Sequence, residues 1–244
     1  MSQIEQLQKL IDESKRIVFF GGAGVSTESG IPDFRSTDGL YHQKYDYPPE
    51  TILSHTFFMK RTEEFYRFYR DKMLYLDAKP NAAHLKLAEL EEAGKLTAVV
   101  TQNIDGLHQR AGSRNVIELH GTTLKHYCTA CKAVMPNEQV KALRGQIPRC
   151  EKCNHIVRPD VVLYEEPLNQ SVIEEAIDAI SLADLLIIGG TSLAVYPAAN
   201  FIRYFKGENI VLINRDETRY DGMATLVFRE SIGEVLESVL LSLE

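Results

Sequence analysis

The 244-residue chain has few cysteines and no long apolar runs. No stretch is long and apolar enough to cross a bilayer. Residues 1–15 are polar and amphipathic, so they lack the apolar centre of a signal peptide. The only cysteines are four with the spacing of metal ligands, which agrees with a reducing compartment. We therefore expect a cytoplasmic protein with no membrane partner.

Several motifs of hydrolytic enzymes are also missing. The chain contains neither GxSxG nor HExxH, so nothing supports a hydrolase that uses its own serine or a catalytic zinc. The HxE of zinc deaminases is absent as well. A formal net charge of -7 argues against general nucleic-acid binding. These absences direct attention to what the cysteines and the strand ends can do.

The four cysteines form two CxxC pairs that are separated by eighteen residues. This spacing is typical of two tight turns that together present four thiolates to one tetrahedral zinc ion. Four thiolates leave no open coordination position, so the metal is expected to be structural and not catalytic. Neither His126 nor His155 is needed as a ligand. The predicted ligands are Cys128, Cys131, Cys150 and Cys153.

Outside the cysteine-containing segment, short apolar runs alternate with helical patterns. The helical patterns cover 59–76, 81–93 and 170–181. Alternation of this kind predicts an α/β fold, with a doubly wound, mostly parallel sheet covered on both faces. One main domain and one small domain are expected. The predicted strands are 16–20, 96–100, 115–119, 184–189 and 209–214.

Polar residues begin where each predicted strand stops, and ligands of such folds bind beyond the carboxyl ends of the strands. We therefore expect five strand ends to meet at one crevice, although polar loops of this kind occur in any such fold. The sequences that follow the strands are GGAGVSTESGIPDFR, TQNIDGLH, HGT, GTSLAVYPA and NRDE.

The first of these loops contains Gly22-Ala23-Gly24, which allows backbone amides to approach a phosphate closely. A pyrophosphate group is the expected ligand of this loop. The dinucleotide fingerprint of hydride-transfer enzymes requires a third glycine, where this chain has Thr27, and its acidic residue is missing too. An NAD dehydrogenase is therefore a weaker hypothesis. Ser26 and Thr27 could equally cap a helix.

The combined motifs resemble those of the sirtuins, in the same order and over essentially the whole chain. The resemblance implies a Rossmann-like domain of residues 1–121 and 159–244, with an inserted zinc-binding domain of residues 122–158. It also implies NAD as a co-substrate for removing acetyl and other uncharged acyl groups from protein lysine. The products would be nicotinamide and O-acetyl-ADP-ribose. The residues that carry the resemblance are 22–35, 101–108, 119–121, 190–198, 213–214 and the two CxxC pairs.

The same resemblance implies roles for single residues. His120 would act as the general base on a ribose hydroxyl, with Asn103 also among the catalytic residues, and a neutral imidazole suits that task near pH 7. Asp105 would anchor the nicotinamide carboxamide. Expected NAD contacts are Ala23, Gly24, Thr27, Phe34, Arg35, Gln102, Asn103, Ile104, Asp105, His120, Gly190, Thr191, Ser192, Asn214 and Ile232.

Substrate is expected to lie between the domains, pairing as an added strand with residues 161–164 while Val162 lines the acyl tunnel. The family's usual phenylalanine-glycine-glutamate ending is here Tyr164-Glu165-Glu166, which affects peptide preference more than catalysis. Members that remove succinyl groups carry a tyrosine and an arginine three residues later. Here Tyr66 is followed three residues later by Tyr69, so uncharged acyl groups are favoured.

Two other functions compete with deacetylation. One is transfer of ADP-ribose to protein. The other is a nucleic-acid-binding zinc ribbon with an NAD-sensing domain, because residues 122–158 carry seven Lys/Arg against two Glu. Acidic overall charge, and Tyr127 as the one aromatic of the ribbon, count against nucleic acid. These basic residues could also form a docking patch for an acidic partner, or simply offset the charge of a zinc tetrathiolate.

Overall fold

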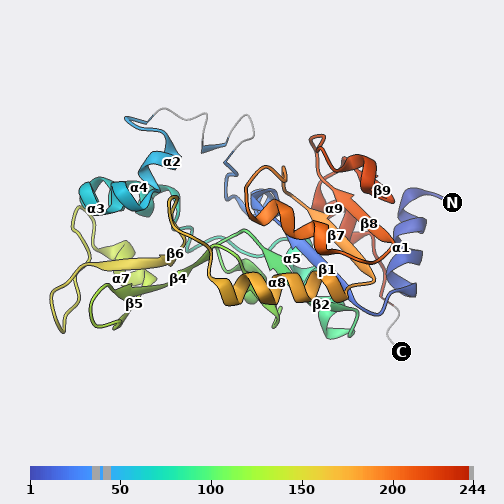
Figure 1. Ribbon diagram of the computed structural model, residues 1–244, viewed down its shortest axis with the longest axis horizontal. Coiled ribbons are helices and arrows are strands. Elements are labelled where there is room, and N and C mark those ends of the chain that lie inside the picture. The colour runs from blue at the N-terminus through green and yellow to red at the C-terminus, as the bar shows by residue number, and fades with distance from the viewer. Residues whose placement is uncertain (35–38, 41–44, 242–244) are drawn as a thin grey trace.

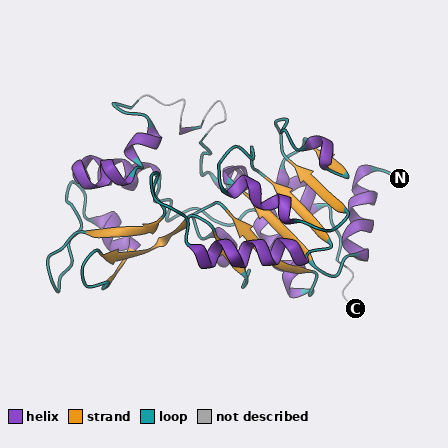
Figure 2. Cartoon of the chain, in the orientation of Figure 1, coloured by secondary structure: helices purple, strands orange, loops and turns teal. Residues whose placement is uncertain are grey.

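A computed structural model describes residues 1–34, 39–40 and 45–241. It contains a large parallel sheet and a small antiparallel sheet, which lie toward opposite ends of the molecule (Figures 1 and 2). The large sheet has six strands in the order β3-β2-β1-β7-β8-β9. Its strands are β1 (Ile17–Gly21), β2 (Leu96–Thr101), β3 (Val116–Glu118), β7 (Leu185–Gly189), β8 (Asn209–Ile213) and β9 (Leu226–Phe228).

Side chains of the central strands alternate between two separate cores. Phe19 of β1 faces one core, while Val18 and Phe20 face the other. Helices α1 (Gln3–Glu13), α5 (Ala82–Glu92) and α9 (Ile232–Glu237) cover the first face. Helix α8 (Gln170–Leu182) and the 3₁₀ segment η4 (Ala198–Tyr204) cover the second. Burial on both sides explains the continuous apolar runs, and the predicted doubly wound fold is confirmed.

The strand order reverses between β1 and β7, since β2 and β3 lie on one side of β1 and β8 and β9 on the other. All pairings in this sheet are parallel, and β1 is in register with β7 from Ile17–Leu185 to Gly21–Gly189. The carboxyl ends of β1 and β7 therefore mark the switch point, where such folds bind ligands.

The small sheet has the order β5-β4-β6 and is antiparallel. It shares a third core with helices that precede it in the sequence by about fifty residues. Phe58, Phe65 and Tyr66 of those helices are almost fully buried in this core, beside Cys128 and Cys150. The elements are α2 (Pro49–Ile52), α3 (His55–Lys60), α4 (Thr62–Lys72), β4 (Gly121–Cys128), β5 (Val134–Pro136), α7 (Asn137–Ala142) and β6 (Val157–Val161).

The expected helix over 59–76 is wrong in its bounds, because the chain forms two helices that meet at Arg61. Arg61 has φ -136° and ψ +50°, which is outside the helical region. The helix expected over 81–93 is confirmed as α5, where the Asn81 side chain caps the first turn. The helix expected over 170–181 is confirmed as α8. No helix among the described residues is both long and apolar enough to cross a membrane.

Candidate active site

A cavity of about 630 Å³ lies beyond the carboxyl ends of the large sheet and is lined on its other side by residues 161–168, which begin at the end of β6 of the small sheet. Five strand ends contribute to its wall, as the polar loops predict. The lining includes Gly22, Ala23, Gly24 and Ser26 after β1, Gln102, Asn103, Ile104 and Asp105 after β2, His120 after β3, Gly190, Thr191 and Ser192 after β7, and Asn214 after β8.

Two glycine loops interlock at the switch point. The Gly24 amide donates a hydrogen bond to the Gly190 carbonyl at 2.8 Å. A Cβ atom on Gly24 would lie 2.8 Å from Gly190 Cα, closer than real Cβ contacts come. Gly190 itself has φ +57°, the left-handed region that favours glycine. Only glycine at both positions allows the two loops to touch, and this contact shapes the cavity wall at the switch point.

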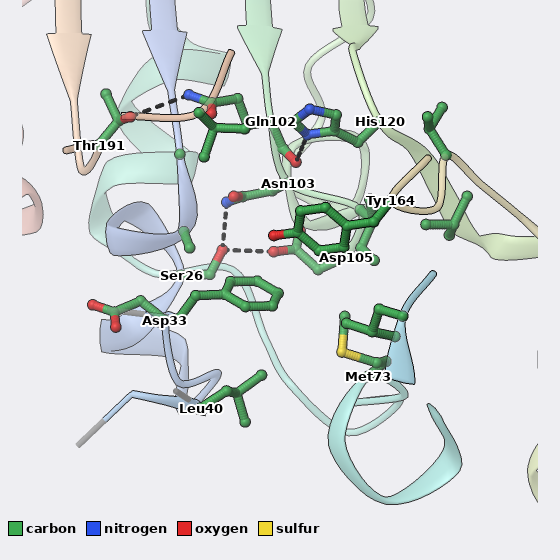
Figure 3. A pocket seen from close by; sticks show the side chains of 18 of the residues that line it. Ser26, Asp33, Leu40, Met73, Gln102, Asn103, Asp105, His120, Tyr164 and Thr191 are labelled. Carbon is green, nitrogen blue, oxygen red and sulfur yellow. Dashed lines mark hydrogen bonds between the residues drawn. The ribbon is translucent and has the colours of Figure 1, made fainter. Parts of the chain in front are cut away.

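Three side chains form a hydrogen-bonded chain behind the glycine loop (Figure 3). Ser26 donates to Asp105 Oδ2 at 2.7 Å, and Asn103 Nδ2 donates to Ser26 Oγ at 3.1 Å. The second oxygen of Asp105 accepts from the Leu107 amide at 2.9 Å. Ser26 is only 1% exposed. The chain fixes the Asp105 carboxylate at the cavity wall, where it can accept hydrogen bonds from an amide.

The sequence alone leaves open whether Ser26 caps a helix or contributes to the site. Its hydroxyl caps no helix, because it donates its hydrogen bond to Asp105. Thr27 Oγ1 donates to the Gly24 carbonyl at 2.9 Å and closes the same loop. The capping interpretation is therefore wrong for both hydroxyls. The sequence feature that could have indicated a role in the site is the position of Ser26 in the loop that also contains the glycines.

His120 lies at the end of β3 with its Nδ1 atom 2.9 Å from the Gln102 carbonyl oxygen. A carbonyl only accepts, so Nδ1 carries the proton and Nε2 keeps a lone pair. Burial lowers the pKa of His120, and the hydrogen bond to the Gln102 carbonyl opposes this only in part. The imidazole is therefore neutral near pH 7 and able to take a proton. Gln102 is held in turn, since its Nε2 donates to Thr191 Oγ1 at 3.1 Å.

The opposite wall of the cavity is formed by the segment after β6. Its backbone is tied to the α2–α3 junction, because the Tyr164 amide donates to the Leu53 carbonyl and the His55 amide donates to the Tyr164 carbonyl, each at 3.0 Å. Val162 lines the cavity, as expected. Its amide donates to the His120 carbonyl at 2.9 Å, so this wall is joined directly to the end of β3.

Glu166 holds this wall in shape. Its two oxygens accept from Arg158 Nη1 and Nη2 at 2.7 and 2.8 Å, and one also accepts from the Leu163 amide at 2.9 Å. His55 Nδ1 lies 2.8 Å from the other. Burial acts to raise the pKa of Glu166, but these hydrogen bonds outweigh it and lower the pKa to about 2. The carboxylate is therefore charged at neutral pH.

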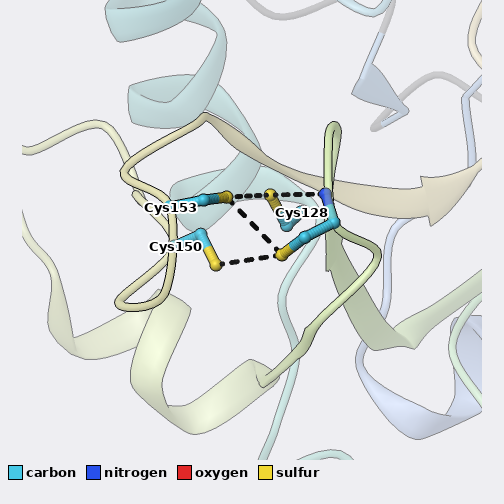
Figure 4. A group of neighbouring side chains, drawn as sticks. Cys128, Cys150 and Cys153 are labelled. Atoms are coloured by element: carbon cyan, nitrogen blue, oxygen red, sulfur yellow. Dashed lines mark hydrogen bonds between the residues drawn. The ribbon is translucent and has the colours of Figure 1, made fainter.

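The four cysteine Sγ atoms all lie within 4.8 Å of one another (Figure 4). Neighbouring pairs are 3.4 to 3.5 Å apart, too far for a disulfide and close to the edge of a tetrahedron with Zn–S bonds of about 2.3 Å. Neither nearby histidine is placed as a metal ligand. His126 Nε2 is hydrogen-bonded to the Tyr69 hydroxyl at 3.0 Å, and His155 Nδ1 lies 3.0 Å from the Cys153 carbonyl. The donor set fits one structural zinc ion.

Known proteins share both the sequence and this architecture. The model of the Sir2 family matches residues 22–197. The chain is 59% identical to an NAD-dependent protein deacetylase of Clostridium acetobutylicum over 242 residues, 98% of this chain and 99% of the relative. The chain belongs to the Sir2 family. A Clostridium perfringens relative with the same name is 57% identical and covers 98% of each chain.

Solved Sir2 structures have the same fold as this Sir2-family chain. One contains a p53 peptide and NAD⁺, with a TM-score of 0.85, 43% identity, and coverage of 97% of this chain and 96% of that one. A Sir2 variant with a deacetylated p53 peptide and 3'-O-acetyl ADP-ribose gives a TM-score of 0.89 at 42% identity, with 97% of each chain covered. The family resemblance of the sequence is therefore confirmed.

Not every predicted contact of this Sir2-family chain lies on the cavity wall. Phe34 does, whereas Arg35 is outside the described residues. Ile232 is 5% exposed and packs in the core, where a Cβ atom on Gly189 would collide with it. Thr27 is next to the wall and acts on the loop that forms it. The roles of these residues toward NAD stay predictions.

Proposed function

We propose that this chain removes acetyl groups from lysine side chains of proteins, with NAD as co-substrate, and releases nicotinamide and O-acetyl-ADP-ribose. The proposal rests mainly on His120, which lines a cavity at a Rossmann-type switch point. Its imidazole is neutral, with the proton on Nδ1 and a lone pair on Nε2. Curated relatives with the name NAD-dependent protein deacetylase support it. We place the protein in the bacterial cytoplasm.

In this proposal the glycine loops and Thr191 bind the diphosphate, and Asp105 holds the nicotinamide carboxamide through its fixed carboxylate. Bound NAD supplies a ribose carbon that the acetyl oxygen attacks as nicotinamide leaves. His120 would then take a proton from a ribose hydroxyl onto Nε2, while Nδ1 stays bonded to the Gln102 carbonyl. The hydroxyl oxygen attacks the acetyl carbon, the bond from that carbon to the lysine nitrogen breaks, the protonated amine leaves, and water supplies the oxygen that completes O-acetyl-ADP-ribose. The zinc ion holds the small sheet together and takes no part in these steps.

The substrate peptide is proposed to lie along residues 161–164, with the acetylated side chain directed past Val162. A relative supports a peptide substrate, since one Sir2 structure contains an acetylated peptide. We place the small domain at residues 122–158 and the NAD-binding domain at 1–121 and 159–244, so that the peptide is held between them.

Uncharged acyl groups are the proposed preference. Arg70 is buried, and its guanidinium donates hydrogen bonds to the carbonyls of Val140 and Gln146. It is therefore not available to pair with an acyl carboxylate in the cavity. Tyr69, at the position where desuccinylating members have arginine, lines the cavity instead. Lys72 also lines it, but its Nζ lies 3.2 Å from Asp71. Burying a succinyl carboxylate without a partner is unfavourable.

The test is His120→Ala. Deacetylation of an acetyl-lysine peptide should fall by about 10²- to 10⁴-fold, the usual contribution of a general base, while the affinity for NAD changes little. Wild-type deacetylation by this variant would contradict the assignment. Label transferred from NAD to protein, with the acetyl group retained on the peptide, would indicate ADP-ribose transfer instead.

A further inference from the structure

Glu165 lines the cavity in a backbone conformation that favours glycine. Its φ is +75°, in the left-handed region where a side chain crowds the backbone. The family pattern that the chain resembles has glycine at this place, and glycine adopts this conformation without strain. A strained conformation that is retained at the wall of a site points to a use for the side chain.

The carboxylate of Glu165 is held in a defined place. Its Oε2 atom accepts from the Thr56 amide at 2.8 Å. The backbone on its amino-terminal side is fixed by the pairing of Tyr164 with the α2–α3 junction. Hydrogen bonding to Thr56 lowers the pKa of Glu165, with smaller contributions from His55 and Lys60. The side chain therefore presents a negative charge at neutral pH.

The Glu165 carboxylate is hydrogen-bonded to the Thr56 amide, but within the described part of the chain it has no ion-pair partner. Glu166 next to it is paired with Arg158 and His55, whereas Glu165 forms no ion pair with any residue that the structure describes. Lys60 acts on it only through space. The Glu165 side chain is exposed. A cation of the substrate can therefore reach it without displacing another cation.

We propose that Glu165 is a specificity-determining residue that favours substrates with lysine or arginine beside the acetylated lysine. The inference rests on the peptide site proposed above. Residues 161–164 lead directly into Glu165, so a peptide that pairs with them carries its flanking residues past this carboxylate. Alternate side chains of an extended peptide point to one side, which sets one or two flanking positions to meet it.

The experiment compares acetyl-lysine peptides that differ only in the two flanking residues, which are arginine, glutamine or glutamate. For the wild-type protein with saturating NAD, kcat/KM for the arginine peptide should exceed that for the glutamine peptide by about threefold to fivefold, the range of an exposed ion pair. The glutamate peptide should be poorer than the glutamine peptide. Raising NaCl to 0.5 M should reduce the arginine-to-glutamine ratio and the glutamine-to-glutamate ratio of kcat/KM, because exposed charges are screened.

Glu165→Gln and Glu165→Gly should each bring the arginine-to-glutamine ratio to about one. Glu92→Gln is the matched control, since it removes an exposed glutamate from the end of α5 and should leave the ratio as in wild type. A wild-type ratio near one, or a ratio unchanged in both Glu165 variants, overturns the inference while deacetylation stands. Absence of deacetylation and of nicotinamide release with every peptide would instead overturn the proposed function.

Discussion

Replacing Glu166 by glutamine tests whether the wall that receives the peptide is held by charge. The fold lowers the pKa of this carboxyl from an ordinary value of 4.5 to about 2. That difference corresponds to about 3 kcal/mol by which the fold favours the carboxylate over the neutral form. The group is 17% exposed, so solvent screens this interaction only weakly. Glutamine keeps the shape but leaves Arg158 without its counter-charge, at a cost of about 2 to 3 kcal/mol.

Two assays separate stability from site geometry. Urea unfolding at pH 7 should show the loss in free energy of unfolding, and the KM for the acetyl peptide should rise more than the KM for NAD, because Glu166 holds only the peptide wall. Glu64→Gln is the control. The Arg61–Glu64 pair has the same 2.8 Å contact but side chains that are 48% and 34% exposed, so it should cost no more than about 0.5 kcal/mol. Equal losses in both variants would refute the reasoning.

Three further predictions concern the glycine loops, the buried histidines and the metal. Gly24→Ala should weaken NAD binding and cost about 1 to 3 kcal/mol of stability, because its Cβ meets Gly190, whereas Gly222→Ala, where a Cβ meets nothing, should not. Burial lowers the pKa of His84 to about 4 and of His108 to about 3. The unfolded chain therefore binds more protons than the folded chain below about pH 6.5. Urea unfolding should show that the free energy of unfolding falls by about 2 kcal/mol per histidine between pH 7 and pH 5. An unchanged free energy of unfolding over this range would contradict the prediction. Removal of zinc by a chelator should abolish deacetylation and disorder the small sheet while the large sheet stays folded by circular dichroism; full activity after verified metal loss would contradict the structural role.

The parallel sheet and the convergence of its strand ends could be predicted because they depend on local sequence. Each central strand is a short apolar run with burial on both faces, and each run ends in a polar loop. Parallel pairing then brings those loops together at one edge without further information. The cysteine spacing was similarly sufficient, since two tight turns fix the places of four Sγ atoms.

Features that depend on distant contacts could not be predicted. The break at Arg61 has no glycine or proline to mark it, and Thr56 at the start of α3 is held by Glu165, more than a hundred residues away. Ser26 shows its role only through Asp105, which follows another strand. The antiparallel small sheet and its shared core with α2–α4 were missed for the same reason, as was β9.

The basic segment 122–158 also has an explanation in long-range contacts. Lys141 donates to the carbonyls of Arg70 and Leu74 at the end of α4, and Lys125 lies 3.7 Å from Asp160. With Arg158, which is paired with Glu166, at least three of the seven basic residues of this segment thus have partners within the protein. This supports a structural interpretation of the segment over a docking patch for an acidic partner or nucleic acid.

The central claim is tested most directly by mass analysis of the products formed from NAD and an acetyl-lysine peptide. The account predicts free nicotinamide, a peptide lighter by one acetyl group, and O-acetyl-ADP-ribose, in equal amounts. Reduced cofactor in place of nicotinamide would indicate a dehydrogenase. Nicotinamide release with the acetyl group still on the peptide and ADP-ribose attached to protein would contradict deacetylation as the reaction.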